Sequence, residues 1–201
     1  MGFDLNGLKP QENTKKPEIL IKHPIGWQIE DESIQKEWSN AYEKWENENP
    51  GVYFRNNVWW WRPLWNFVCG TCQNILTEKD MSKGTYNDGH KISKTKSKKI
   101  AARLRKLIKD LDVKIYAAHF EEERQRAVEH NKEVQDKIDA LKEEVKQLGG
   151  DMAPKDYPER YKTRWDELQD CKKWEGNYPF DEENVKEFAD FCEQSGGFEI
   201  Y

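Results

Sequence analysis

The sequence lacks the features of membrane-spanning and secreted proteins. Among its 201 residues, no apolar run approaches the roughly 18 residues that a transmembrane helix needs. The chain does not open with the charged and apolar regions of a signal peptide. Its four cysteines are too few for a disulfide framework in a chain of this size. We therefore expect a protein of the reducing cytoplasm that has no membrane partner.

Glycine and proline are missing from a long internal stretch, between His90 and Leu148. Nothing in the local chemistry therefore ends a helix there. Apolar residues form two stripes of different phase, the second with the spacing of a heptad seam: Ile100, Leu104, Leu107 and Leu111, then Val134, Ile138, Leu141, Val145 and Leu148. We expect either one very long helix that changes partners or two helices in an antiparallel hairpin. The seam would serve self-association or packing within the chain.

Apolar residues are scarce for the length of the chain, at 36% against 35% charged residues. Aromatic residues offset this scarcity, because they make up 12% of the chain and include nine tryptophans. Each buried ring removes a large apolar area from water. A disordered chain would not carry so many rings, so we expect one folded domain, with residues 1–111 and 149–201 as its core and 112–148 as a helical or coiled-coil extension.

The centre of the sequence, residues 52–76, holds four of the nine tryptophans. Its β-branched and aromatic residues predict a strand over residues 52–61. Pro63 then suits the first position of a helix, whose buried face is predicted by apolar residues at three- and four-residue steps from Leu64 to Leu76. Neighbouring side chains of a strand alternate faces. At least one of the three adjacent tryptophans would therefore lie against another element, such as the long helix, or against a partner or a ligand.

The two ends of the sequence predict strands that pair with each other, because residues 2–8 and 198–201 each alternate apolar and polar side chains. Helices are expected over residues 29–49, 157–174 and 182–194, the last capped by Asp181. Residues 9–24 are expected to form a loop with a brief strand at 19–21, and residues 83–92 a turn that leads to Ser93 as a helix cap. The predicted fold class is α+β, mostly helical, with a small sheet built from the two termini and the central strand.

Several strings in the sequence resemble an uncharacterised family of hypothetical proteins from tailed phages and some bacteria. They are FRNNVWWWRPLW at 54–65, YNDGHKIS at 86–93, FADFCEQSGGFEI at 188–200 and the opening GFDLNGL. The resemblance covers about half of the chain, and residues 112–150 look like an insertion. The family has no established activity, so it supplies no catalytic residues. It implies a phage-encoded accessory protein in the cytoplasm of an infected bacterium, with a host factor, such as a component of host defence, as its partner.

Side chains in the tryptophan-rich stretch and in the later turn are candidate contacts for a ligand or partner. They combine aromatic rings with polar groups: Tyr53, Arg55, Trp59, Trp60, Trp61, Arg62, Asn87, Asp88 and His90. The turn residues among them are also those that a small metal-dependent hydrolase would use to bind a metal or move protons. The sequence contains no phosphate loop, nucleophile elbow or dinucleotide fingerprint, and we expect a protein that is not an enzyme.

Zinc is the one cofactor that the sequence suggests. Cys69 and Cys72 form the single CxxC motif, and His90, Cys171 or Cys192 would complete a tetrahedral site. The pair lies within an apolar helical face, where free cysteine behaves as a small hydrophobic residue. The alternative expectation is therefore that no cofactor is bound.

A run of positive charge extends from Ser93 to Lys114, with nine basic residues against two aspartates. The predicted basic helix would present Lys94, Lys98, Lys99, Arg103, Arg105 and Lys106. Together with the tryptophans, this run predicts binding of a nucleotide or a single-stranded nucleic acid. Packing against the acidic C-terminal third explains the run equally well. Our leading hypothesis is a non-enzymatic binding protein that acts through protein–protein contacts, with a homo-oligomer through the coiled-coil segment as a further possibility.

Overall fold

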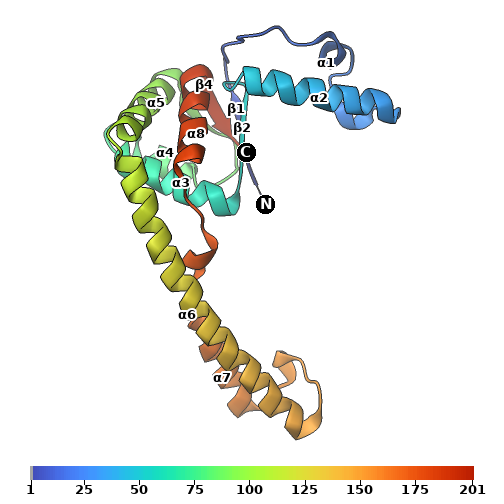
Figure 1. Ribbon diagram of the computed structural model, residues 1–201, viewed down its shortest axis with the longest axis vertical. Helices are drawn as coiled ribbons and strands as arrows, with labels where there is room; N and C mark the ends of the chain where they lie inside the picture. The colour runs from blue at the N-terminus through green and yellow to red at the C-terminus, as the bar shows by residue number, and fades with distance from the viewer. Residues whose placement is uncertain (1) are drawn as a thin grey trace. The chain divides into compact units, whose positions relative to one another are not determined.

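The computed structural model describes residues 2–201, which form two compact units (Figure 1). The first unit comprises the chain up to Ile115 and again from Asp181 onward, and the second comprises residues 116–180. The first is α+β and the second is helical, which confirms the predicted fold class. Among residues 2–201, no helix combines the length and the apolar character needed to cross a membrane.

The elements of the first unit come from both ends of the chain. In order they are β1 (Gly2–Gly7), α1 (Glu18–Lys22), η1 (Gly26–Gln28), α2 (Glu32–Glu48), β2 (Tyr53–Asn57), α3 (Val58–Thr71), α4 (Glu78–Lys83), β3 (His90–Ser93), α5 (Lys94–Lys109), α8 (Glu182–Gln194) and β4 (Gly197–Ile200). The second unit contains most of α6 (Asp112–Gly149), then η2 (Pro154–Asp156), α7 (Glu159–Asp170) and η3 (Trp174–Asn177).

The four strands form one antiparallel sheet in the order β2-β1-β4-β3. The strands near the two ends of the chain lie side by side at its centre, with Leu5 opposite Ile200, so the predicted pairing is confirmed. Strand β3 was not expected, because four residues beginning at His90 are too short to show a periodic pattern. Alternate residues of each strand are buried, among them Phe3, Leu5 and Phe198, and the residues between them carry polar side chains.

An aromatic stack lies under the buried face of the sheet. The Trp61 ring of α3 stacks on Phe3 of β1 at 5.4 Å between centroids and on Trp65 at 5.2 Å. Phe188 of α8 meets the Trp61 ring edge-on at 5.8 Å. The indole nitrogen of Trp61 donates to the Gly84 carbonyl at 2.8 Å, so its polar group is satisfied although the side chain is fully buried.

The boundary between strand and helix at the centre of the chain corrects the sequence prediction. Strand β2 ends at Asn57 rather than at residue 61, and the three adjacent tryptophans lie on α3. The Asn57 side chain caps α3 by accepting hydrogen bonds from the backbone N–H groups of Trp59 and Trp60, at 2.9 and 3.2 Å. Pro63 therefore lies inside the helix instead of starting it. The missing N–H costs one helical hydrogen bond, and burial of the surrounding apolar side chains offsets this loss.

The N-terminal loop is held by a buried amide side chain. Asn49, at the end of α2, accepts hydrogen bonds from the backbone N–H groups of Asn13 and Thr14 and donates to the Trp45 carbonyl and the Thr14 hydroxyl. All four of its hydrogen-bonding positions are thus used. The brief strand predicted at residues 19–21 is wrong, because this segment forms the short helix α1, which packs on α2.

The glycine-free stretch after His90 forms two helices. The chain breaks between α5 and α6, where Leu111 adopts a φ of 65°, a conformation that costs a non-glycine residue about 1–2 kcal/mol. The antiparallel partner of α6 is α7, not α5, and the two lie alongside each other (Figure 1). The seam residues Val134, Ile138, Leu141 and Val145 are buried within this unit, so the seam is filled from within the chain.

The predicted helix caps are confirmed. Ser93 caps α5 by accepting from the Lys96 N–H, and Asp181 caps α8 by accepting from the Asn184 N–H at 2.8 Å. Helix α8 ends at Gln194, and Gly196 follows with a positive φ of 65°, as expected for a glycine just beyond a helix. These short-range signals positioned both ends of α8 correctly.

We predict that Trp61→Ala lowers the free energy of unfolding by about 3–5 kcal/mol, because it removes the central ring of a fully buried stack. The matched change Trp59→Ala removes an identical side chain that is 40% exposed, and it is expected to cost about 1 kcal/mol or less. Urea unfolding followed by circular dichroism measures both. Equal losses in the two variants would contradict the placement of Trp61 at the centre of the core.

Candidate functional site

The tryptophan-rich stretch does not form a single aromatic surface. Trp61 belongs to the core, while Trp60 is partly exposed and Trp59 is 40% exposed. Arg62, one position after Trp61, is also exposed. The helix thus turns the three adjacent rings in three directions, as its rotation of about 100° per residue requires. Trp60 lines a cavity together with polar residues.

Three of the predicted contact residues line a groove between β2 and α8. Tyr53 and Arg55 line a cavity of about 410 Å³, and Trp60 lines a neighbouring cavity of about 240 Å³. The two cavities share Glu187 of α8. We call this feature the β2–α8 groove; its lining residues are Glu46, Asn47, Pro50, Tyr53, Phe54, Arg55, Asn56, Trp60, Asp181, Glu183, Asn184, Glu187 and Asp190.

The β2–α8 groove carries an excess of carboxyl groups, of which Asp190 and Glu183 are paired with Arg105 and Lys186. The pKa of Glu187 is raised mainly by burial, and the negative charges of Glu183 and Asp181 raise it further. Burial also raises the pKa of Glu46, against a hydrogen bond from Tyr42 that lowers it. One carboxylate oxygen of Glu46, Oε1, is buried and has no hydrogen-bond partner among residues 2–201. A cation entering the groove would relieve both the repulsion and the lost hydration.

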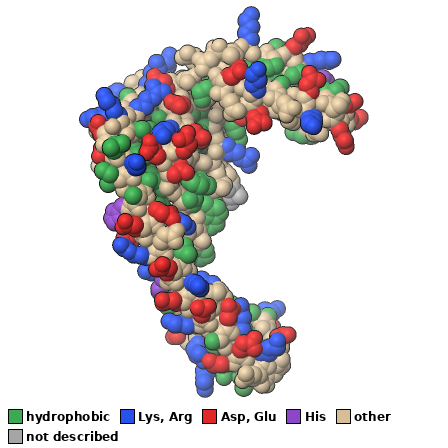
Figure 2. Space-filling view, viewed as in Figure 1, with side chains coloured by type: hydrophobic (Ala, Val, Ile, Leu, Met, Phe, Trp, Pro, Cys, Tyr) green, Lys and Arg blue, Asp and Glu red, His purple; other side chains and the backbone are tan. Residues whose placement is uncertain are grey.

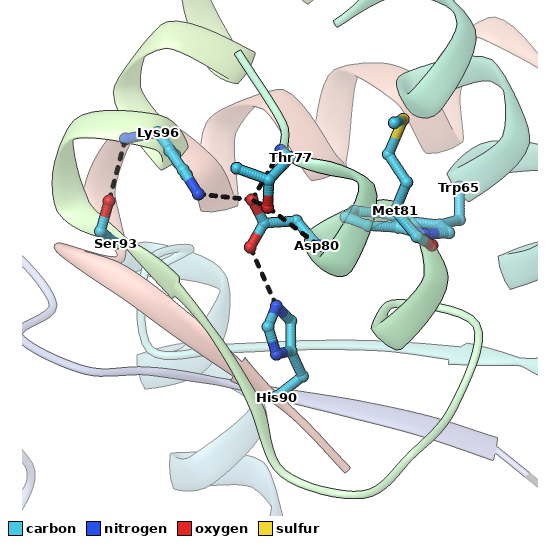
Figure 3. A network of polar contacts seen from close by, with 7 residues as sticks. All are labelled: Trp65, Thr77, Asp80, Met81, His90, Ser93 and Lys96. Carbon is cyan, nitrogen blue, oxygen red and sulfur yellow. Dashed lines mark hydrogen bonds and ion pairs between the residues drawn. The ribbon is translucent and has the colours of Figure 1, made fainter. Parts of the chain in front are cut away.

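A separate polar network joins α4, β3 and α5 around the buried carboxylate of Asp80 (Figure 3). His90 Nε2 lies 3.0 Å from one carboxylate oxygen. The other oxygen accepts from Lys96 Nζ and from the hydroxyl and backbone N–H of Thr77, the latter at 2.8 Å. Thr77 and Asp80 also form a capping box at the start of α4.

The groups around Asp80 hold it in the ionised form. Burial alone would raise its pKa, but hydrogen bonds from Lys96, Thr77 and His90 outweigh burial and hold the pKa well below its usual range. The network therefore ties three elements together by charge. Sequence reasoning missed Asp80 and Lys96, although the spacing Thr77-x-x-Asp80 is a capping-box signal that could have identified the first.

The turn residues predicted to act with His90 do not converge on it. Asn87 and Asp88 are exposed, and Asp88 pairs with Lys83 at 2.6 Å on the surface. His90 instead turns toward Asp80, and its side chain is only 13% exposed. The structure therefore does not gather the side chains that the hydrolase hypothesis placed together.

The cysteines of the CxxC motif are held as thiols. Burial raises the pKa of Cys69 to about 12, and the neighbouring Cys72 adds a smaller part of this shift. Burial also raises the pKa of Cys72, and metal binding requires the thiolate form. The third predicted ligand, His90, is engaged by Asp80. Within residues 2–201, no three His, Cys, Asp or Glu side chains come together as a metal site, and zinc at this pair stays a prediction.

The predicted basic helix is α5, and one of its cations does pack against the acidic C-terminal segment. Arg105 pairs with Asp190 at 2.8 Å and with Glu193 at 3.1 Å, both on α8. The others among the predicted cations, Lys94, Lys98, Lys99, Arg103 and Lys106, form no ion pair within residues 2–201. Three of them line a cavity with Asn74, beyond the C-terminal end of α3. Trp59 and Trp60 lie at the N-terminal end of α3, about 20 Å from Asn74. The tryptophans and the cations of α5 therefore do not form one site.

We predict that Asp80→Asn lowers the free energy of unfolding by about 2–3 kcal/mol at pH 7, because Lys96 loses its buried counter-charge and His90 loses its contact with a carboxylate oxygen. Since the folded pKa of Asp80 is depressed, this stabilisation is present above the unfolded pKa of about 3.9. It is lost as the pH falls below that value toward the folded pKa. Chemical denaturation between pH 3 and 7 should show the difference between the wild type and the variant narrowing as the pH falls below about 4. The control Asp88→Asn, in an exposed pair, should leave stability unchanged at pH 7.

Some of the predicted site residues thus gather in three places: the β2–α8 groove, the network around Asp80 and the outer face of α5. The others lie apart from these places: Trp59, Trp61, Arg62, Cys69, Cys72, Asn87 and Asp88. Apart from Glu46 of α2, the acidic residues that line the groove come from α8 and its cap, about 130 residues after β2 in the chain, and no local motif links them to β2. Comparison with protein-family models, with curated proteins and with solved structures finds no match to this chain.

Proposed function

We propose that this chain is a non-enzymatic binding protein whose protein partner docks a basic segment in the β2–α8 groove. The observation that carries this proposal is the pair of neighbouring cavities that share Glu187 in their lining, one lined by Tyr53 and the other by Trp60. Partly exposed aromatic residues at the edge of a cavity are typical anchors of protein interfaces.

The charge of the groove favours a basic partner. Five carboxylic acid residues line it, Glu46, Asp181, Glu183, Glu187 and Asp190. Asp190 is paired with Arg105 at 2.8 Å and Glu183 with Lys186 at 3.5 Å, which leaves Glu46, Asp181 and Glu187 against the single guanidinium group of Arg55. Arg55 is itself engaged with Asp4, at 3.4 Å. A lysine or arginine from a partner would meet Glu187, whose pKa is raised by burial and by neighbouring charge. It would also lie within reach of the Trp60 ring for a cation–π contact.

The edge of the sheet supplies a backbone template for the same partner. Strand β2 is the first strand in the sheet order and pairs only with β1 among residues 2–201. An extended segment can therefore add beside β2 through main-chain hydrogen bonds, a common mode of peptide recognition. The resemblance to phage proteins makes a host protein the expected source of this segment.

We predict that Glu187→Lys and Trp60→Ala each reduce capture of the partner from bacterial extract by at least about tenfold, because they reverse the charge of the groove and remove its aromatic anchor. Capture is quantified by mass spectrometry on immobilised protein, together with the melting temperature of each variant. Both side chains are at least partly exposed, so the melting temperature should change little.

The matched control for charge is Glu129→Lys, an exposed glutamate of α6 in the second unit. It makes the same change in net charge away from the groove and should leave capture unchanged. The proposal fails if every protein captured by the wild type is retained equally by the two groove variants. It also fails if the control reduces capture as much as Glu187→Lys does.

A further inference from the structure

Helix α5 carries positive charge without any internal compensation. Eight of its 16 residues are lysine or arginine, and none is aspartate or glutamate. The rest of the chain is acidic enough to give a net charge of −5. Positive charge is therefore concentrated on one element of an acidic protein, and Lys and Arg side chains gather over α5 in Figure 2.

The fold neutralises only the two flanks of this helix. On one side Arg105 pairs with Asp190 and Glu193 of α8. On the other side Lys96 pairs with the buried Asp80 of α4. Between these flanks lie the remaining cations, none of which forms an ion pair among residues 2–201: Lys94, Lys98, Lys99, Arg103, Lys106 and Lys109. We call this surface the α5 cationic face.

The α5 cationic face is hollowed beside the loop that follows α3. Lys99, Arg103 and Lys106 line a cavity of about 370 Å³ with Asn74 and Ile75. They recur at four- and three-residue steps, so they form one row on the helix. The nearest polar partner is uncharged, because Arg103 Nη2 donates to the Asn74 side chain at a long distance of 3.5 Å. Three cations thus converge on a concave surface that offers them no carboxylate.

We propose that the α5 cationic face binds the phosphate backbone of a nucleic acid without reading its sequence. Helix α5 is about 24 Å long at 1.5 Å per residue. One strand of a nucleic acid carries a phosphate about every 3.4 Å, so about seven phosphates span that length. This number matches the six cations of the face. One row of carboxylates on an acidic helix has a charge every 5–6 Å or so, about four over the same length, so it offers fewer anions than the face has cations.

The composition of the face determines how the nucleic acid is held. None of the residues that line its cavity is aromatic, so no ring is present there on which a base could stack. Lysine, arginine and asparagine side chains all donate to phosphate oxygens. Binding is therefore electrostatic, and it weakens steeply as the salt concentration rises. The face is separate from the β2–α8 groove, so this inference does not depend on the proposed protein partner.

The test uses the full-length protein and a fluorescein-labelled 20-base-pair duplex, with fluorescence anisotropy measured from 50 to 200 mM salt. The wild type is expected to bind, with a plot of log affinity against log salt that falls linearly. The triple variant Lys99→Gln, Arg103→Gln, Lys106→Gln should bind at least about tenfold more weakly at 50 mM salt. Its slope should be shallower by about 3, because three phosphate contacts are lost at about 0.9 each. A single strand of the same length should show the same dependence on these residues, with about 0.7 per contact.

The control variant Lys132→Gln, Lys137→Gln, Lys155→Gln has the same net charge as the triple variant. Its exposed lysines belong to the second unit and form no ion pair within residues 2–201. It should bind the duplex within about twofold of the wild type. Equal weakening in both variants would show that net charge alone governs binding and would overturn the proposal, as would no wild-type binding at 50 mM salt. Polyglutamate that displaces the duplex at equal charge concentration would identify an acidic protein as the better ligand and would also overturn it.

Discussion

The stack of Trp61 on Phe3, Trp65 and Phe188 is the interaction on which the rest of the first unit depends. It joins a strand near the N-terminus, a helix from the centre of the chain and a helix from near the C-terminus. Because one ring meets all three, the rotation of α3 about its axis is fixed. Trp60 then faces the β2–α8 groove. At the far end of α3, the following loop places Asn74 and Ile75 beside α5. Both proposed binding surfaces thus depend on the orientation that this stack imposes.

The sequence predicted those parts of the fold that local chemistry determines. Asp181 and Ser93 are caps whose side chains bond to backbone only three residues away. The alternation in the two end strands needed only a few residues each. The failure at residues 58–61 had a different cause, since valine and tryptophan favour strands. Asn57 nevertheless caps a helix there, and the contacts that favour this helix involve Phe3 and Phe188, which are distant in sequence.

For the candidate site too, the residue types could be predicted from the local sequence, whereas their neighbours in the fold, which are distant in sequence, could not. Tyr53, Arg55 and Trp60 could be named as contacts from their types, but most of the carboxyl groups that line the groove with them belong to α8 and its cap. The turn at Asn87 and Asp88 was predicted, but its direction was not. His90 is drawn inward by Asp80, whose own position depends on the α4 capping box. The cations of α5 were visible in the sequence, yet only the structure separates Lys96 and Arg105, which are neutralised, from those that are not.

The adjacency of β1 and β4 determines when this chain can fold during its synthesis. Strand β1, residues 2–7, can pair with β4 only after residues 197–200 have been synthesised. About 190 residues separate the two strands, and closing so long a loop adds to the entropic cost of folding. The second unit, by contrast, is one continuous segment. On the ribosome its helical pair can form first, while Phe3 and Trp61 remain without Phe188. The aromatic core is thus exposed until residues 188–200 have been synthesised, and a nascent chain of this kind is a natural substrate for a chaperone that binds apolar side chains.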